Sequence, residues 1–167
     1  KDIGMLLSER EENFEKLNRQ CIEFDNDLIE KTTAKGGEDY AIITALALRQ
    51  CVAANKLVAD FDGTPLVFSK ENFSNGCMGT VDVIYPAAPF FFYFNLELMK
   101  ANLTPVLIYA DSHRWKFPFA PHDLGQYPLA NGQAYGGREE NEINQMPVEE
   151  SGDMIIMLAA ISFREGN

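Results

Sequence analysis

The sequence is short of the residues that disulfide scaffolds, zinc sites and membrane proteins need. Its 167 residues include only three cysteines (Cys21, Cys51, Cys77), an odd number without any Cys-x-x-Cys spacing, which argues against a disulfide framework. The two histidines have no zinc-motif spacing, and we expect the three thiols to be buried and inert. No run of about eighteen apolar residues occurs, so no membrane-spanning helix is expected.

Positive charge is also scarce. There are 14 Lys and Arg against 25 Asp and Glu, a net charge of −11, which argues against nucleic acid or an anionic membrane as the main partner. Hydrophobic content of 46% and charged content of 23% are those of an ordinary globular protein.

We expect residues 1–167 to form a single helical segment. Because the chain starts at Lys1 without Met, we also expect it to be a piece of a longer protein.

Two helices are predicted in the first third of the chain. Ser8 and Glu11 have the spacing of a capping box, which predicts a helix start. One apolar stripe follows, and Gly36-Gly37 ends it; the stripe comprises Phe14, Leu17, Cys21, Phe24 and Leu28. The second helix, from Asp39 to Asn55, is apolar almost all round, so we expect it to be buried on most sides.

The remaining pattern predicts one hairpin and three more helices. Asp62-Gly63 lies between two short β-prone runs, which is a hairpin signal. A third helix is expected to begin after Pro86 or Pro89 and to run to Asn102. A fourth should start at Thr104-Pro105 and end near Trp115. A fifth should run from Pro147 to Phe163. The fold class is therefore mainly α, and alternating surface and buried helices favour part of an α/α toroid over a four-helix bundle.

A long segment between the fourth and fifth helices carries most of the candidate chemistry. Glycines and prolines punctuate Phe119 to Met154, so we expect Lys116 to Met146 to be largely non-helical. Loops of this length inside a compact domain are usually functional or disordered. Its aromatic, amide and carboxylate side chains suit a binding surface.

Four carboxylates in loop context are the candidate catalytic residues: Asp82, Asp123, Glu149 and Glu150. Hydrolysis of an amide or glycosidic bond needs one group to activate water and another to protonate the leaving atom, and two carboxylates in unlike environments can divide these roles. The alternative for Glu149 or Glu150 is that it only favours its helix N-terminus. If the carboxylates form one site, Asp82, Asp123 and the Glu pair should converge although they are far apart in sequence.

The candidate substrate-binding residues are His122, Tyr127, Asn131 and Gln133. His122 could be a base, an oxyanion partner or a metal ligand, and a lone loop histidine is also often a structural hydrogen-bonding group. Ser74, Ser151 and Cys77 have no nucleophile signature around them. No phosphate loop or dinucleotide motif occurs, and we expect neither a cofactor nor a metal site. The aromatic run 90–94 is expected to be core.

Three strings in this order resemble the central segment of glutaminase A-like proteins: GTVDVIYPAAPFF (79–91), PFAPHDLGQYPLANGQ (118–133) and MPVEESGDMIIM (146–157). The resemblance implies an (α/α)6 toroid, hydrolysis of the glutamine side-chain amide, and a location outside the cytoplasm, extracellular or periplasmic. It also implies that the residues to carry over are Asp82, His122, Asp123, Glu149 and Glu150. The stretch GREENEINQ (137–145) does not match the family strings.

Three functions stay open from the sequence. The first is a glutaminase A-like hydrolase, the second a glycoside hydrolase of the toroid type, and the third a non-catalytic module whose carboxylates hold a metal such as calcium. The expected partners are a small-molecule substrate, glutamine or a glycan, and either the remaining domains of the parent chain or a second copy. The contact is expected along the apolar face of the last helix, from Ile155 to Phe163.

Overall fold

The computed structural model describes residues 2–166. The chain divides into two compact units, residues 1–50 and 51–167. The functional residues predicted from the sequence all belong to the second unit.

The first unit contains two helices and most of a third. α1 (Ile3–Glu12) begins earlier than predicted, because the side chain of Asp2 accepts a hydrogen bond from the Met5 backbone N–H at 2.9 Å and caps the helix. Ser8 therefore lies inside α1, and its predicted capping role is wrong. α2 (Phe14–Gly36) carries the predicted apolar stripe and ends at Gly36, with Gly37 as its C-cap, as predicted. The single helix predicted from Ser8 through the stripe is instead two helices, which meet at Asn13.

α3 (Glu38–Ala53) forms where a helix was predicted, but its burial differs from the prediction. Ala41 is its only buried residue, whereas Ile42, Ile43 and Leu46 are exposed. No helix of the same unit packs closely along α3 within the described residues. An all-apolar helix is buried only where other elements surround it, and that requirement cannot be read from the helix's own residues.

The hairpin prediction is confirmed. β1 (Asn55–Ala59) pairs antiparallel with β2 (Pro65–Ser69), with Leu57 opposite Val67. The turn between them places Gly63 at a positive φ of 91°, which glycine adopts at little cost.

The two central helices are divided differently from the prediction. α4 (Val81–Phe94) begins before both of its prolines, and α5 (Leu96–Ala110) contains Thr104-Pro105 in its interior. Proline prefers a first helical turn, but its φ is also compatible with a helix interior when packing compensates for the lost hydrogen bond. Here Pro105 is itself buried, and the Asn95 side chain caps the true start of α5 by accepting from the Leu98 N–H at 3.2 Å.

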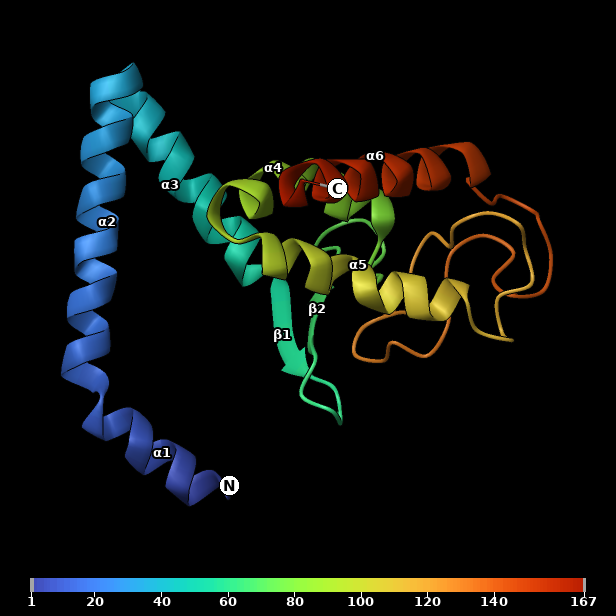
Figure 1. Ribbon diagram of the computed structural model, residues 1–167, viewed down its shortest axis with the longest axis horizontal. Coiled ribbons are helices and arrows are strands. Elements are labelled where there is room, and N and C mark those ends of the chain that lie inside the picture. Colours follow the sequence, from blue (N-terminus) through green and yellow to red (C-terminus); the bar gives the residue numbers. More distant parts are fainter. Residues whose placement is uncertain (1, 167) are drawn as a thin grey trace. The chain divides into compact units, whose positions relative to one another are not determined.

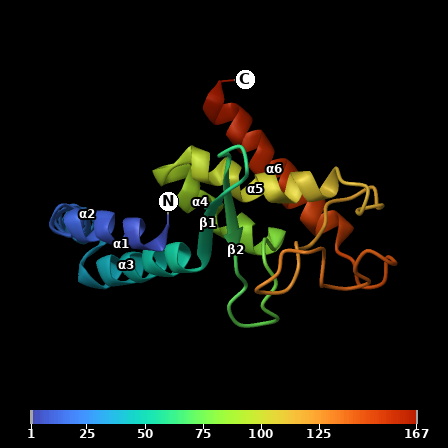
Figure 2. The same ribbon diagram turned by 90° about the horizontal axis from the view of Figure 1, so that it is seen from below.

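α6 (Pro147–Glu165) opens at Pro147, as predicted. In the second unit α4, α5 and α6 pack against one another, and β2 packs on α5 (Figures 1 and 2). Buried side chains of these three helices and of the segment between α5 and α6 form one core, which comprises Val81, Ile84, Ala88, Phe91, Met99, Leu103, Val106, Tyr109, Trp115, Leu124, Met154, Met157 and Ile161. Phe91 alone of the aromatic run 90–94 is fully buried; Phe90 and Phe92 pack against the core, while Tyr93 and Phe94 are exposed.

The segment between α5 and α6 contains no helix, as predicted, and no described helix is long and apolar enough to cross a membrane. The three cysteines differ in environment: Cys77 is buried, Cys51 is half-buried and Cys21 is exposed, so the expectation of burial is wrong for Cys21. Burial raises the pKa of the Cys77 thiol to about 12, which keeps it protonated and unreactive.

Gly79 shows how closely the chain before α4 approaches the long segment. Its φ is 61°, and a Cβ atom there would lie 2.6 Å from Leu124 Cδ1. We predict that Gly79→Ala lowers the free energy of unfolding by about 1–3 kcal/mol, measured by chemical denaturation. The matched control is Gly152→Ala within α6, where a Cβ meets nothing within 4 Å and stability should rise by up to about 1 kcal/mol. Equal effects at the two positions would contradict this account.

Candidate active site

The segment around His122 is bound to the first turns of two helices. The backbone N–H of Val81, at the start of α4, donates to the His122 carbonyl at 2.9 Å. The Ala120 N–H donates to the Ser151 hydroxyl in the first turns of α6 at 3.1 Å. Because the positive ends of both helix dipoles meet here, carboxylates in their first turns are favoured electrostatically.

His122 is buried, and its neighbour in sequence orients the ring. Nδ1 lies 2.9 Å from Asp123 Oδ2. The Tyr135 ring stacks on the imidazole, with the ring centroids 4.1 Å apart and an angle of 17° between the planes. When Nδ1–H donates to Asp123, Nε2 of the neutral ring is left as an acceptor or ligand.

Asp123 is buried, and both of its carboxylate oxygens are fully engaged. Oδ1 accepts from the backbone N–H groups of Gly125 and Ala134, each at 2.8 Å. Oδ2 accepts from the Tyr135 N–H at 3.1 Å in addition to its contact with His122. Four interactions occupy the four lone-pair positions of the carboxylate, so Asp123 both folds the long segment and fixes His122.

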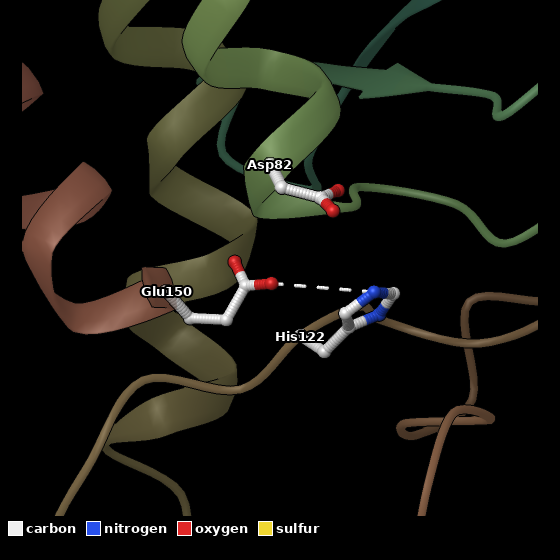
Figure 3. Close-up of side chains that lie close together, drawn as sticks. All are labelled: Asp82, His122 and Glu150. Carbon is white, nitrogen blue, oxygen red and sulfur yellow. Dashed lines mark ion pairs between the residues drawn. The ribbon is translucent and has the colours of Figure 1, made fainter. Parts of the chain in front are cut away.

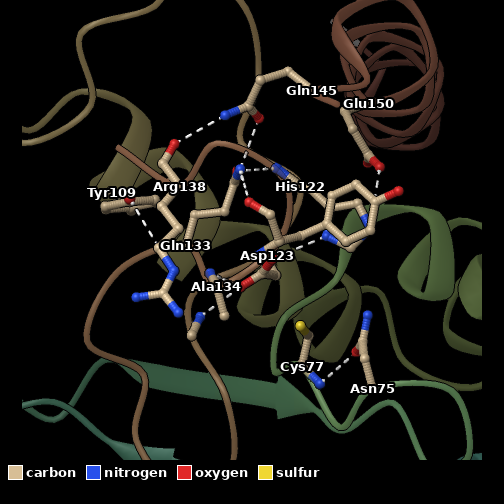
Figure 4. A network of polar contacts seen from close by, with 12 residues as sticks. Asn75, Cys77, Tyr109, His122, Asp123, Gln133, Ala134, Arg138, Gln145 and Glu150 are labelled. Carbon is tan, nitrogen blue, oxygen red and sulfur yellow. Dashed lines mark hydrogen bonds and ion pairs between the residues drawn. The ribbon is translucent and has the colours of Figure 1, made fainter. Parts of the chain in front are cut away.

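Gln133 connects this turn to the rest of the long segment (Figure 4). Its Oε1 accepts from the His122 N–H at 2.7 Å, and its Nε2 donates to Gln145 Oε1 at 2.7 Å and to the Tyr135 carbonyl at 3.0 Å. Gln133 is buried, and these bonds use its acceptor and both donors. Its contacts in this structure are therefore with the protein's own backbone and side chains.

Three side chains from three different parts of the chain point into one space: Asp82 from the first turn of α4, His122 from the long segment, and Glu150 from the first turns of α6 (Figure 3). One ligand atom from each lies within 4.8 Å of the others, and His122 Nε2 is 4.0 Å from Glu150 Oε1. This is a group that could hold a metal ion. Asp82 lies in the first turn of α4, which corrects the expectation that it lies in a loop, whereas Glu150 lies near the start of the helix that was predicted to open at Pro147.

Glu150 is the most unusual side chain of the group. It is 0% exposed, and neither of its carboxylate oxygens has a hydrogen-bond partner. Burial, followed by the charges of Asp82 and Asp153, raises the pKa of Glu150 to about 9. A carboxyl group in this position favours a bound proton or a bound cation.

The other predicted site residues lie apart from this group. Glu149 is exposed on α6. Tyr127 is 60% exposed, with the Lys70 ammonium 5.3 Å from its ring centroid. Asn131 is exposed, and its carbonyl accepts from the Arg114 guanidinium. The structure thus brings together Asp82, His122, Asp123 and Glu150, and it gives Gln133 a supporting position.

Three residues near the group were not predicted. Asp153 lies about one turn after Glu149 and Glu150, a helical spacing that could have indicated it, and its pKa is raised by burial and by Glu149 and Asp82. Glu71 has one buried oxygen without a partner, and burial and the charge of Asp82 raise its pKa. Tyr135, stacked on His122, had no signal in the sequence.

Comparison with known proteins identifies the family of this chain. Residues 37–167 match the model of the glutaminase A six helical-hairpin domain. The chain belongs to this family. Its membership confirms the resemblance seen in the sequence and the assignment to a six-hairpin toroid, of which the described helices form a part.

Two relatives carry names that refer to glutaminase. The chain is 40% identical to "Glutaminase A" of Aspergillus oryzae over 139 residues, which is 83% of this chain and 19% of that protein. It is 34% identical to "Probable glutaminase" of Arthroderma benhamiae over 157 residues, 93% of this chain and 18% of that protein. The chain therefore spans about a fifth of the length of these relatives. No solved structure matches it.

The bonding of Asp123 leads to a stability prediction. In Asp123→Asn one oxygen and its charge are lost, and an amide NH2 faces backbone N–H donors, so the free energy of unfolding should fall by at least about 2 kcal/mol. The His122 ring resonances in an NMR spectrum should also shift, because the ring loses its charged partner. Asp111→Asn, at the exposed C-terminus of α5, is the control and should be nearly neutral. Unchanged stability and unchanged His122 resonances in Asp123→Asn would contradict the positioning role.

Proposed function

We propose that this chain supplies the catalytic carboxylates of a glutaminase A-like hydrolase that converts the side-chain amide of glutamine to glutamate and ammonia. The observation that carries the proposal is the convergence of Asp82, His122 and Glu150 in a chain of this family. These side chains come from positions far apart in sequence. Residues that only capped their own helices would have no reason to converge.

Two carboxylates of unequal exposure suit the two proton transfers of amide hydrolysis. Asp82 is half-buried and can reach water, so it takes a proton from the water that attacks the amide carbon. Glu150 is fully buried and gives its proton to the departing nitrogen, which leaves as ammonia. The proton on Asp82 then returns to Glu150 through solvent, and the cycle closes without any other reactant.

His122 and Asp123 assist these steps from the side. With Nδ1 turned to Asp123, His122 presents Nε2 to the same space and accepts a hydrogen bond from the water or the substrate amide. Asp123 has no free lone pair for proton transfer, so it acts as a positioning residue. Glu149, which is exposed, contributes negative charge near Glu150 and does not contact the group.

A glycosidase of the inverting type is less consistent with the spacing of the carboxylates. Such enzymes separate the two carboxyl groups by about 6.5–9.5 Å to leave room for water. Here the nearest oxygens of Asp82 and Glu150 lie within 4.8 Å of each other, a spacing nearer to the roughly 5–5.5 Å of retaining glycosidases, so a substrate assay decides between the two substrate classes. Ammonia release from glutamine and reducing-sugar release from glycans, measured on the same preparation of the intact protein, distinguish the two substrate classes.

Replacement of the buried carboxyl group should separate activity from stability. We predict that Glu150→Gln lowers kcat for ammonia release by about 10²–10⁴-fold, because the amide cannot donate the catalytic proton. The melting temperature should stay equal or rise, because the variant removes a buried carboxyl group whose oxygens have no hydrogen-bond partner. Asp82→Asn should show a similar loss of kcat.

The matched control is Glu140→Gln, an exposed carboxylate of the long segment. It should leave both kcat and melting temperature unchanged. Glutamine hydrolysis that survives in both Glu150→Gln and Asp82→Asn would overturn the proposed mechanism. Release of sugar, but not ammonia, by the unmodified protein would overturn the proposed substrate class.

We further infer that the outer face of α6 is covered by another polypeptide segment in the intact protein. Ile155, Ile156 and Phe163 are 66%, 53% and 83% exposed. Ile155 also lines an apolar groove between α5, α6 and the aromatic side chains of Trp115, Phe117 and Phe119. The family domain has six helical hairpins, so a further helix of the same domain is the occupant that this face suits.

Light scattering tests this surface on the isolated chain. We expect concentration-dependent self-association, because the apolar face lacks its partner, and Ile155→Gln combined with Ile156→Gln should reduce it. Ile143→Gln is the control, since Ile143 is 67% exposed but lies outside α6. A chain that stays monomeric at all concentrations and does not bind an apolar dye would count against a covered face.

A further inference from the structure

The group formed by Asp82, His122 and Glu150 offers one nitrogen and two carboxylate oxygen ligands from three separate elements (Figure 3). The ligand atoms lie within 4.8 Å of one another, and His122 Nε2 is 4.0 Å from Glu150 Oε1. A cation with bonds of about 2.0–2.2 Å to nitrogen and oxygen separates its ligands by about 3–4 Å. A modest inward movement of the side chains therefore suffices.

The Glu150 carboxylate is an independent sign that the group binds a ligand. It is completely buried, it points toward His122, and neither of its oxygens has a hydrogen-bond donor. Leaving an ionised carboxylate in this state costs several kcal/mol. A cation at this position removes that cost, and it also neutralises the nearby charge of Asp82.

His122 has the surroundings of a metal-binding histidine. Metal ligands of this type commonly donate the second ring N–H to a carboxylate, which fixes the tautomer and aims the other nitrogen. Asp123 occupies this place at 2.9 Å and is itself held by three backbone N–H groups. The Tyr135 ring stacked on the imidazole limits its rotation further.

We propose that Asp82, His122 and Glu150 bind one divalent transition-metal ion of the zinc or manganese class, with water completing the coordination. Calcium suits the group less well, because it favours six to eight oxygen ligands and one ligand here is an imidazole nitrogen. This departs from the expectation, drawn from the sequence, that no metal site exists.

The consequence for catalysis rests on the proposed function. The metal uses the same atoms that activate water and protonate the leaving nitrogen, so a bound ion and the catalytic proton are alternative occupants of one site. Zinc should therefore inhibit glutamine hydrolysis, and a chelator should restore it. Metal availability would then regulate the enzyme through its own catalytic residues.

Equilibrium dialysis of the intact protein, first treated with a chelator, tests binding directly with Zn²⁺, Mn²⁺ and Ca²⁺ as separate probes. We expect one Zn²⁺ per chain and weaker binding of Ca²⁺. The substitutions Asp82→Asn, His122→Asn and Glu150→Gln should each weaken Zn²⁺ binding at least tenfold. Zinc-edge X-ray absorption should show a single imidazole ligand together with oxygen ligands.

Two exposed residues provide control variants. His113→Ala removes the other, exposed histidine, and Glu140→Gln removes an exposed carboxylate, so both should leave Zn²⁺ affinity unchanged. Circular dichroism verifies that each variant is folded, and Asp82→Asn is the variant least able to disturb the core because Asp82 is only half-buried.

Unchanged Zn²⁺ affinity in folded Asp82→Asn and Glu150→Gln, or an absorption spectrum without imidazole, would overturn the metal site. Failure of the proposed function looks different. A protein that binds Zn²⁺ at these residues but releases no ammonia from glutamine keeps the metal site and loses the glutaminase activity. A protein that hydrolyses glutamine and is indifferent to Zn²⁺ keeps the activity and loses the metal site.

Discussion

The carboxylate of Asp123 is the interaction on which the site depends. It gathers three backbone N–H groups from two distant parts of the long segment and the Nδ1 atom of His122. A segment of about thirty residues without helix or strand has few hydrogen bonds of its own to hold it in one conformation. One buried acceptor with four partners supplies that order, and it does so next to the ring that faces Glu150.

The two buried acids of the site, Asp123 and Glu150, have different roles. Asp123 is satisfied on every lone pair and stabilises the fold. Glu150 is equally buried but neither of its oxygens has a hydrogen-bond partner, and its pKa is raised to about 9 by burial and then by the neighbouring acids. A buried polar group without a hydrogen-bond partner is rare in proteins and usually has a function. The unpaired carboxyl oxygens of Glu150 therefore point to proton transfer or to cation binding at this site.

The surrounding charge reinforces the same conclusion. In addition to burial, the charge of Asp82 raises the pKa values of Glu71, Glu150 and Asp153. Concentrated negative charge near a buried carboxyl group makes protons and metal ions favourable and anions unfavourable. A neutral amide substrate, a departing ammonia molecule and a divalent cation are all compatible with this field, and a phosphate-bearing ligand is not.

The elements with strong local signals could be predicted from the sequence: the hairpin at Asp62-Gly63, the stripe of α2, the start of α6 at Pro147 and the absence of helix after α5. Each depends on residues adjacent in sequence or one turn apart, so its physical cause is contained in a short window. The candidate acids were also visible, because carboxylates between glycines and prolines are conspicuous.

Tertiary structure decided the rest. The helices continue through Pro86, Pro89 and Pro105 because core packing compensates for the lost hydrogen bonds, and Asn95 rather than Thr104 starts α5. The sequence could not show that Asp123 is fully hydrogen-bonded whereas Glu150 is not. Two of the N–H groups that donate to Asp123 lie 11 and 12 residues away, and only the fold brings them to the carboxylate. The family could be identified from three strings of residues, whereas the meeting of Asp82, His122 and Glu150 required α4 and α6 to pack with their first turns side by side.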